Sequence, residues 1–140
     1  MPIGTVEFKY YEMGWEEKRM LLNGLKRVLE SIDGILSAYV HGSFIKRGLF
    51  RDVDVAIWIE EREEPFKYEV DLSSRVEVDL KVPVDIHVLN EAPLPFKHVV
   101  FTEGRLLFSR DEEARIGIVD ETIRQYADLR MLRSLCGDRE

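Results

Sequence analysis

The stretch HGSFIKRGLFRDVDVAIWI, residues 41–59, decides how this chain is interpreted. A Gly-Ser turn closes one apolar run, and nine residues later Asp52 and Asp54, separated by one valine, open another. Side chains alternate between the two faces of a strand, so both aspartates are expected on one face while Val53 and Val55 point into the core. Two carboxylates on one face repel each other unless a cation lies between them. The Asp-x-Asp pattern therefore predicts a magnesium site, although many such pairs are only solvated strand ends.

Two neighbouring features favour the metal-site interpretation. Asp85 lies inside the apolar run VPVDIHVL, where an unpaired charge is costly, so we expect it to share a metal with the two aspartates. Gly42 and Ser43 close the preceding strand and open a short helical turn, which offers N–H groups and a hydroxyl to a phosphate. Lys46 and Arg47 would add positive charge there. An ordinary turn is the alternative interpretation of the Gly-Ser pair.

Length and composition describe an ordinary globular chain. The 140 residues are expected to form a single domain, residues 1–140, with 45% apolar and 34% charged residues. No apolar run approaches the roughly 20 residues that span a membrane, and the amino terminus does not look like a secretory signal, which predicts a cytoplasmic protein. The net charge of −7 argues against nucleic-acid binding as the main role.

Hydrophobic periodicity predicts alternating helices and strands. Helices are expected over residues 15–32, 94–103 and 111–135, and strands over residues 35–42, 52–60, 81–90 and 105–110. Residues 66–80 carry both helical and strand periodicity, and we favour a helix because parallel strands need a crossover segment. The predicted class is α/β or α+β, with helices around one sheet.

The last predicted helix has two apolar regions. One stripe is expected to dock on the rest of the domain, and its members are Ile116, Val119, Ile123 and Tyr126. Residues 129–135 are apolar on more than one side, which predicts a protein interface there.

Two histidines and a tryptophan lie near the predicted site. His87 shares a strand face with Asp85 and could line the site, but we favour a hydrogen-bonded structural histidine. The same interpretation applies to His41, which precedes Gly42. Trp58 shares the face of the two aspartates farther along the strand and is expected in the core.

Gly42-Ser43, Asp52-Val-Asp54 and the later Asp85 together resemble the minimal nucleotidyltransferases of the DNA polymerase beta superfamily. The tail GRLLFSRDEEARIGIVDETIRQYADLR, residues 104–130, is similar to the closing strand and helix of the members that pair with HEPN proteins. This sequence departs from many relatives at two positions. Lys46 replaces a glycine, and Arg51 stands where a serine is common.

The resemblance implies a nucleotidyltransferase fold, a short, mixed, mostly antiparallel sheet with helices packed on one face. It implies transfer of AMP from ATP to an acceptor hydroxyl, a tyrosine of a HEPN toxin, which makes the chain an antitoxin. It also implies roles for the matched residues. Asp52, Asp54 and Asp85 would be catalytic and hold Mg²⁺, and the triphosphate would bind at Gly42, Ser43, Lys46 and Arg47.

Two other functions remain open at this point. The chain could be a non-catalytic antitoxin that neutralises a HEPN partner by contact alone. Nucleotidylation of a small molecule is less favoured because 140 residues leave no second domain to hold such a substrate. The sequence allows homo- or hetero-oligomers and does not choose between them.

Overall fold

The structure, a computed structural model, describes residues 10–46 and 48–137. Its strands are β1 (Tyr11–Glu12), β2 (Ile35–His41), β3 (Leu49–Phe50), β4 (Val53–Ile59), β5 (Val84–Val88) and β6 (Arg105–Ser109). Its helices are α1 (Trp15–Glu30), α2 (Ser43–Lys46), α3 (Pro65–Lys67), the π-helical turn η1 (Tyr68–Leu72), α4 (Ser73–Leu80), α5 (Leu94–Glu103) and α6 (Glu112–Leu135). Each helix and strand predicted from the sequence is present, with ends that differ by a few residues.

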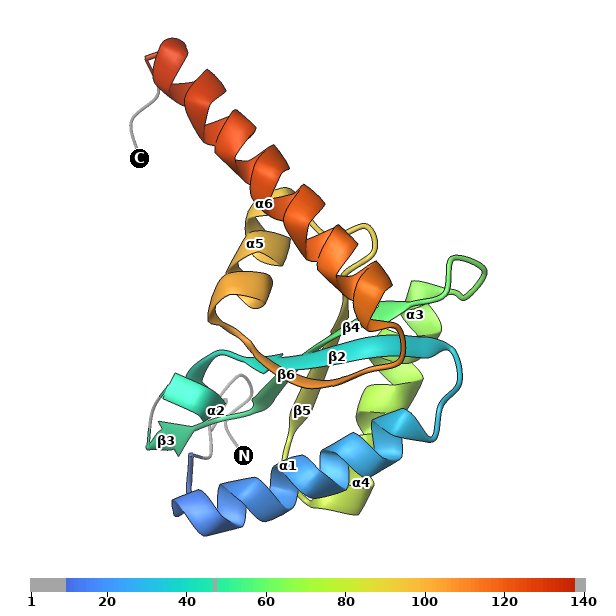
Figure 1. The fold of residues 1–140 in the computed structure, drawn as a ribbon. Coiled ribbons are helices and arrows are strands. Elements are labelled where there is room, and N and C mark those ends of the chain that lie inside the picture. Colours follow the sequence, from blue (N-terminus) through green and yellow to red (C-terminus); the bar gives the residue numbers. More distant parts are fainter. Residues whose placement is uncertain (1–9, 47, 138–140) are drawn as a thin grey trace, which may run out of the picture.

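A four-stranded mixed sheet with the order β5-β4-β2-β6 forms the centre of the fold (Figure 1). β2 pairs with β4 and β6 in antiparallel fashion, whereas β4 and β5 are parallel. β1 and β3 pair separately in a small antiparallel ribbon. The parallel pair brings the starts of β4 and β5 to the same end of the sheet, which positions the candidate site.

The larger core lies between one face of the sheet and a layer formed by α1, η1 and α4 (Figure 1). Alternate residues of the central strands point into this layer, and Leu25 and Leu29 of α1 meet them there with no exposed surface. The strand residues that share this core include Val53, Val55, Ile57, Val84, Ile86 and Val88. This face therefore holds the apolar positions on either side of the two strand aspartates.

α5 packs on the opposite face of the sheet, where a smaller cluster of buried residues lies. The cluster contains Tyr39, Ala56, Leu89 and Val100, and Trp58 packs against it as the sequence predicted. α6 lies along α5, and the rings of His98 and Tyr126 stack with their centroids 3.9 Å apart. The predicted fold class is confirmed, but helices cover both faces of the sheet, because α5 and α6 lie on the face opposite the layer of α1, η1 and α4.

Residues 66–80 are helical, as favoured from the sequence, and this segment lies along the outer edge of β5. Three of its polar side chains accept hydrogen bonds from outward backbone N–H groups of β5. The pairs are Glu69 with Val88 at 3.1 Å, Ser73 with Ile86 at 3.3 Å and Glu77 with Val84 at 3.0 Å. A helix edge thus satisfies donors that a further strand would otherwise pair.

α6 begins at a capped end, since the Asp111 carboxylate accepts a hydrogen bond of 3.0 Å from the N–H of Ala114. The predicted docking stripe was wrong in part. Ile116 and Ile123 are exposed, whereas Val119 and Tyr126 are half-buried as predicted and Thr122 is buried. The buried face of the helix therefore shares only part of the predicted stripe.

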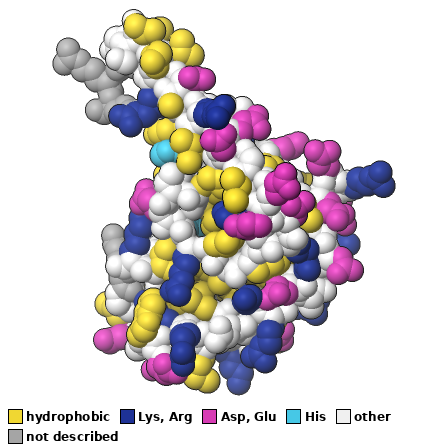
Figure 2. Space-filling view, viewed as in Figure 1, with side chains coloured by type: hydrophobic (Ala, Val, Ile, Leu, Met, Phe, Trp, Pro, Cys, Tyr) yellow, Lys and Arg dark blue, Asp and Glu magenta, His cyan; other side chains and the backbone are white. Residues whose placement is uncertain are grey.

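The last turns of α6 extend beyond the body of the molecule (Figure 1), and apolar side chains are gathered at this free end (Figure 2). Met131, Leu132 and Leu135 are 65%, 59% and 78% exposed. Among the described residues, each helix is too short or too polar to cross a lipid bilayer.

Candidate active site

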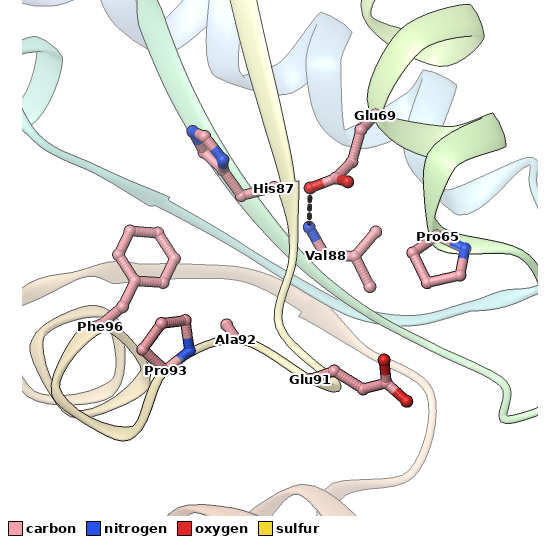
Figure 3. Close-up of a pocket in the computed structure, with 8 residues that line it drawn as sticks. All are labelled: Pro65, Glu69, His87, Val88, Glu91, Ala92, Pro93 and Phe96. Carbon is pink, nitrogen blue, oxygen red and sulfur yellow. Dashed lines mark hydrogen bonds between the residues drawn. The ribbon is translucent and has the colours of Figure 1, made fainter.

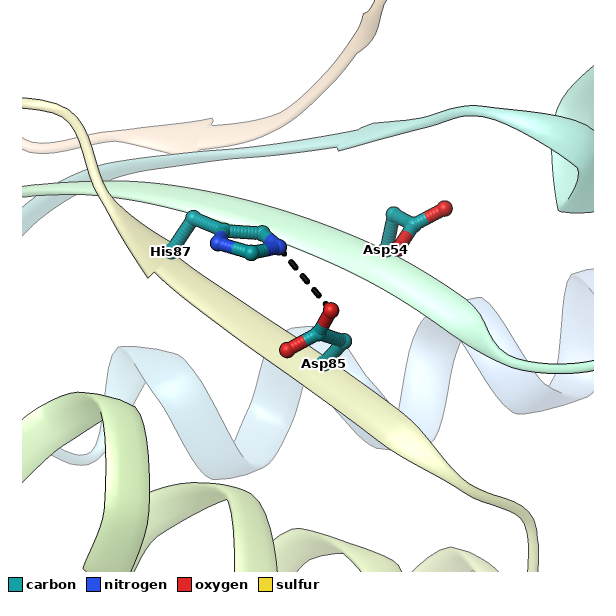
Figure 4. Close-up of side chains that lie close together, drawn as sticks. All are labelled: Asp54, Asp85 and His87. Carbon is teal, nitrogen blue, oxygen red and sulfur yellow. Dashed lines mark hydrogen bonds and ion pairs between the residues drawn. The ribbon is translucent and has the colours of Figure 1, made fainter. Parts of the chain in front are cut away.

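The candidate site lies where β4 and β5 begin, on the face that carries α5. Asp54 and Asp85 are direct partners in the parallel register, so their side chains point to the same face of the sheet (Figure 4). His87 follows two residues later on β5 and points to that face as well. One ligand atom from each of these three side chains lies within 4.8 Å of the others.

Asp52 lies just before β4, outside the strand that the sequence predicted to contain it. Its carboxylate is 3.9 Å from the guanidinium of Arg51. It does not belong to the close group of Asp54, Asp85 and His87, but it lines a shared pocket with the two other aspartates. Both residues of the Asp-x-Asp pattern therefore line one pocket, but only Asp54 lies in the close group with Asp85 and His87.

This polar pocket has a volume of about 360 Å³. Four of the residues predicted from the sequence line it, namely Ser43, Asp52, Asp54 and Asp85. Arg51 lines the same pocket, so a cationic side chain stands at the position where relatives commonly have a serine. The structure therefore brings the Gly-Ser turn and the three carboxylates together.

The backbone at Gly42 brings the turn close to Asp54. Gly42 has a φ of +78°, a conformation that glycine adopts without strain. A Cβ at this position would lie 2.4 Å from Asp54 Oδ2, which is too close for any side chain. The positive φ and the close approach of Asp54 therefore each favour glycine at this position.

The carboxylates destabilise one another's charged form. Burial, with the nearby charges of Asp52 and Asp85, raises the pKa of Asp54 to about 6. Beside it, burial and the neighbouring His87 lower the pKa of His41 to about 4. Nε2 of His41 is buried and finds no hydrogen-bond partner among the residues that the structure describes.

Of the two basic residues that the sequence predicted to bind phosphate, the structure describes only Lys46. The ammonium of Lys46 lies 2.5 Å from the carboxylate of Glu103 at the end of α5, and Lys46 is not among the residues that line the polar pocket. This ion pair lowers the pKa of Glu103. Arg47 lies outside the described residues, so its predicted role stays a prediction.

The donor set fits a divalent cation. The close group offers carboxylate oxygens and an imidazole nitrogen, and burial together with the charges of Asp52 and Asp85 raises the pKa of Asp54, so a cation there would favour its ionised form. His87 Nε2 lies 3.0 Å from Asp85 Oδ2, and an N–H at this ring nitrogen donates to the carboxylate and holds it in orientation. His87 is thus hydrogen-bonded, as predicted, and lies closer to the site than the sequence suggested.

A second and larger pocket of about 530 Å³ adjoins this group along β5 (Figure 3). His87 lines it together with Val88, Phe96 and Pro93, and Phe96 packs its edge against the His87 ring. Sequence reasoning missed this pocket. Its lining comes from α3, η1, β5 and α5, and no local motif marks residues that meet only after folding.

Comparison with protein families gives a direct assignment. Residues 23–113 match the family described as polymerase beta, nucleotidyltransferase, which is more than half of the chain and contains the turn and all three aspartates. The chain belongs to the polymerase beta nucleotidyltransferase family. It is a nucleotidyltransferase by this membership, as the motif resemblance predicted. A search of curated protein sequences found no match.

Solved structures with the same fold come from toxin–antitoxin complexes. A complex of a tri-AMPylated HEPN toxin with an MNT antitoxin from Shewanella oneidensis contains a chain with 20% identity and a TM-score of 0.69, covering 85% of this chain and 94% of that one. The MntA–HepT toxin–antitoxin complex gives 19% identity, a TM-score of 0.68 and coverages of 84% and 94%. A toxin–antitoxin structure with AMP-PNP has 21% identity and a TM-score of 0.70, and the match covers 82% of this chain and 94% of that one. The predicted minimal nucleotidyltransferase fold is therefore confirmed.

Proposed function

We propose that this protein transfers AMP from ATP to a tyrosine hydroxyl of a HEPN-domain toxin and acts as the cytoplasmic antitoxin of that toxin. The observation that carries the proposal is the single polar pocket that holds Ser43 and the three aspartates. Family membership supports nucleotidyl transfer. The AMPylated toxin in the complex from Shewanella oneidensis, a structure with the same fold, supports this acceptor class.

Asp52, Asp54 and Asp85 would hold the magnesium ions, and His87 would orient Asp85 through its hydrogen bond. Bound Mg²⁺ would neutralise the charge of the triphosphate and of the transition state. Burial and the two neighbouring carboxylates raise the pKa of Asp54 to about 6, so positive charge in the pocket would favour its ionised form. The site is thereby matched to a metal–nucleotide complex better than to nucleotide alone.

The remaining residues of the pocket would bind the phosphates. Gly42 and Ser43 would place backbone and hydroxyl groups beside the β- and γ-phosphates, and Arg51 adds a guanidinium to that side of the pocket. Lys46 would have to leave Glu103 to reach them, and Arg47 could join from the same turn. Asp85, which is more than half exposed, would accept the proton of the incoming hydroxyl.

A labelling experiment tests the proposed function. With α-³²P-labelled ATP, magnesium and a HEPN partner, the wild-type protein should label the partner covalently. Asp85→Asn keeps the volume of the side chain and removes its charge, so the variant should still form the complex and should not label it. Asp79→Asn, an exposed aspartate of α4, is the matched control and should label the partner normally.

A contact-only antitoxin is the competing function, and the exposed apolar end of α6 supports it independently of the pocket. The two functions differ in one observable result. If the wild-type protein neutralises the toxin without transferring nucleotide, and Asp85→Asn neutralises it equally well, the chain is a binding antitoxin.

A further inference from the structure

The pocket of about 530 Å³ adjoins a second pocket of about 370 Å³, since Pro65 and Glu91 line both of them. We call the two together the acidic groove. Its carboxylates come from the loop after β4, from η1 and from the loop after β5, and they are Glu60, Glu61, Glu63, Glu69 and Glu91. Figure 2 shows acidic side chains at the right-hand edge of the molecule, with a basic side chain that projects outward among them, where Figure 1 places the loop before α3.

Positive side chains do not balance these carboxylates inside the groove. Neither lysine nor arginine is among the described residues that line the two pockets. Apart from His87 and Asn90, the remaining walls are apolar, with Phe96, Pro93 and Pro65 in the larger pocket and the indole of Trp58 in the smaller one. Such a groove favours an aromatic side chain that is attached to a positively charged segment, and it disfavours a triphosphate.

The position of the groove relative to the aspartates decides what can enter it. The polar pocket with Ser43 and Arg51 lies at the start of β5, and the acidic groove begins at His87 and continues past the end of that strand. Asp85 lines the polar pocket and contacts His87, which lines the groove. In-line displacement at phosphorus requires the attacking oxygen and the leaving group on opposite sides of the phosphorus atom. With pyrophosphate on the Ser43 side, the attacking hydroxyl arrives from the groove side.

We propose that the acidic groove is the acceptor site and that it selects a tyrosine within a basic segment of the acceptor protein. This inference rests on the proposed function and adds the acceptor's position and charge. The phenol oxygen bonds to the α-phosphorus, and the bond from that phosphorus to the oxygen that bridges the α- and β-phosphates breaks, which releases pyrophosphate. The phenolic proton passes to Asp85. The tyrosine ring lies against Phe96 and Pro93, and the flanking cations face Glu61 and Glu91.

Two synthetic peptides test the charge preference. Each contains one tyrosine, flanked by arginines in one peptide and by glutamates in the other. With labelled ATP and magnesium, the wild-type protein should transfer AMP to the arginine peptide with a kcat/KM at least roughly tenfold higher, a preference that falls as salt is added. Equal transfer to both peptides would overturn the charge assignment.

Variants of the groove test its position. Glu61→Lys/Glu91→Lys changes two exposed side chains and should lower kcat/KM for the arginine peptide by roughly tenfold, with the affinity for magnesium–ATP unchanged by calorimetry. Asp71→Lys/Asp79→Lys, on η1 and α4, makes the same change in charge away from the groove and should leave both quantities unchanged. Ala92→Leu narrows the groove without changing its charge. This variant should lower kcat/KM for the arginine peptide and leave the affinity for magnesium–ATP unchanged.

Failure of this inference and failure of the proposed function give different results. If the wild-type protein labels the peptides or a partner while the groove variants behave like wild type, nucleotidyl transfer stands and the acceptor site lies elsewhere. If Ala92→Leu or the double lysine variant weakens ATP binding instead, the groove holds the nucleobase and the acceptor assignment is wrong. If the wild-type protein labels no acceptor at all, the proposed function fails and the acceptor site fails with it.

Discussion

Gly42 and Asp54 touch across the β2–β4 pair so closely that a methyl group on Gly42 would lie 2.4 Å from Asp54 Oδ2. Replacing the glycine must therefore move either the turn or the carboxylate. Gly42→Ala should lower the free energy of unfolding by about 1–3 kcal/mol, since the positive φ is also strained for alanine. Chemical denaturation measures this loss, and calorimetry should show weaker binding of magnesium–ATP.

Gly48→Ala is the matched control, because a Cβ at Gly48 would meet no atom within 4 Å. This substitution lies in the same connection between β2 and β4 and should change neither stability nor nucleotide binding. Equal effects of the two substitutions would mean that the contact with Asp54 does not constrain the turn.

Removing the charge of Asp54 should stabilise the metal-free protein. The pKa of Asp54 is about 6 in the folded state and about 4 when unfolded, so the folded state holds the proton more tightly. Stability is then lost as pH rises through the interval from about 4 to about 6, and the loss is complete above it. Asp54→Asn should gain about 1–2 kcal/mol at neutral pH, a value reduced for the side chain's partial exposure.

The pH dependence of the same variant gives a second check, because His41 has the opposite sign. Its folded pKa of about 4 lies below the unfolded value of about 6.5, so stability falls as pH drops through that interval. In the wild-type protein the effects of Asp54 and His41 on the dependence of stability on pH therefore oppose each other. With Asp54→Asn in chelator-treated buffer, stability should rise steadily from pH 4 to pH 6.5; a flat profile would contradict the burial of His41.

Loss of a carboxylate from the polar pocket should remove metal-dependent nucleotide binding. Asp52→Ala and Asp54→Ala should each weaken the affinity for ATP in the presence of magnesium by more than about tenfold, or ~1.4 kcal/mol. The affinity in the presence of a chelator should be unchanged. Calorimetry with Asp79→Ala serves as the control. Unchanged magnesium-dependent binding in both variants would rule out the predicted metal site.

The exposed end of α6 should carry the partner interface. Truncation after Asp128 removes Met131, Leu132 and Leu135, which are largely exposed, so the remaining chain should unfold at nearly the wild-type temperature and still bind ATP. Binding to the HEPN partner should be lost, as measured by size-exclusion chromatography. Met131→Lys/Leu135→Lys in the full-length chain should reproduce the loss. Persistence of the complex after both changes would place the interface elsewhere.

Local patterns were sufficient to predict most of the fold. Alternating apolar residues identified β4 and β5, and Asp111 marked the start of α6. The same patterns brought Ser43 and the three aspartates into one predicted site, and they do line one pocket. Each of these features depends on neighbours in the chain or on the period of one element.

Features that depend on how separate elements pack were not predictable in this way. The acidic groove needs Glu91 and Phe96 beside Pro65 and Trp58, residues that belong to different elements. The buried face of α6 includes Thr122 and the Tyr126 ring that stacks on His98, whereas the apolar pattern predicted Tyr126 together with Ile116 and Ile123, which are exposed. Periodicity gives the faces of an element but not its rotation against a neighbour.

The row of Glu69, Ser73 and Glu77 along β5 limits how this segment can change in evolution. Four helical residues advance by about 6 Å and two strand residues by about 6.6 Å, which is why every fourth helical residue meets every second strand residue. Inserting or deleting one residue between Ser73 and Glu77 would turn Glu77 by about 100° and leave the N–H of Val84 without its acceptor. Length variation should therefore be confined to the loop before α3, whose variation would reshape the groove without unpairing β5.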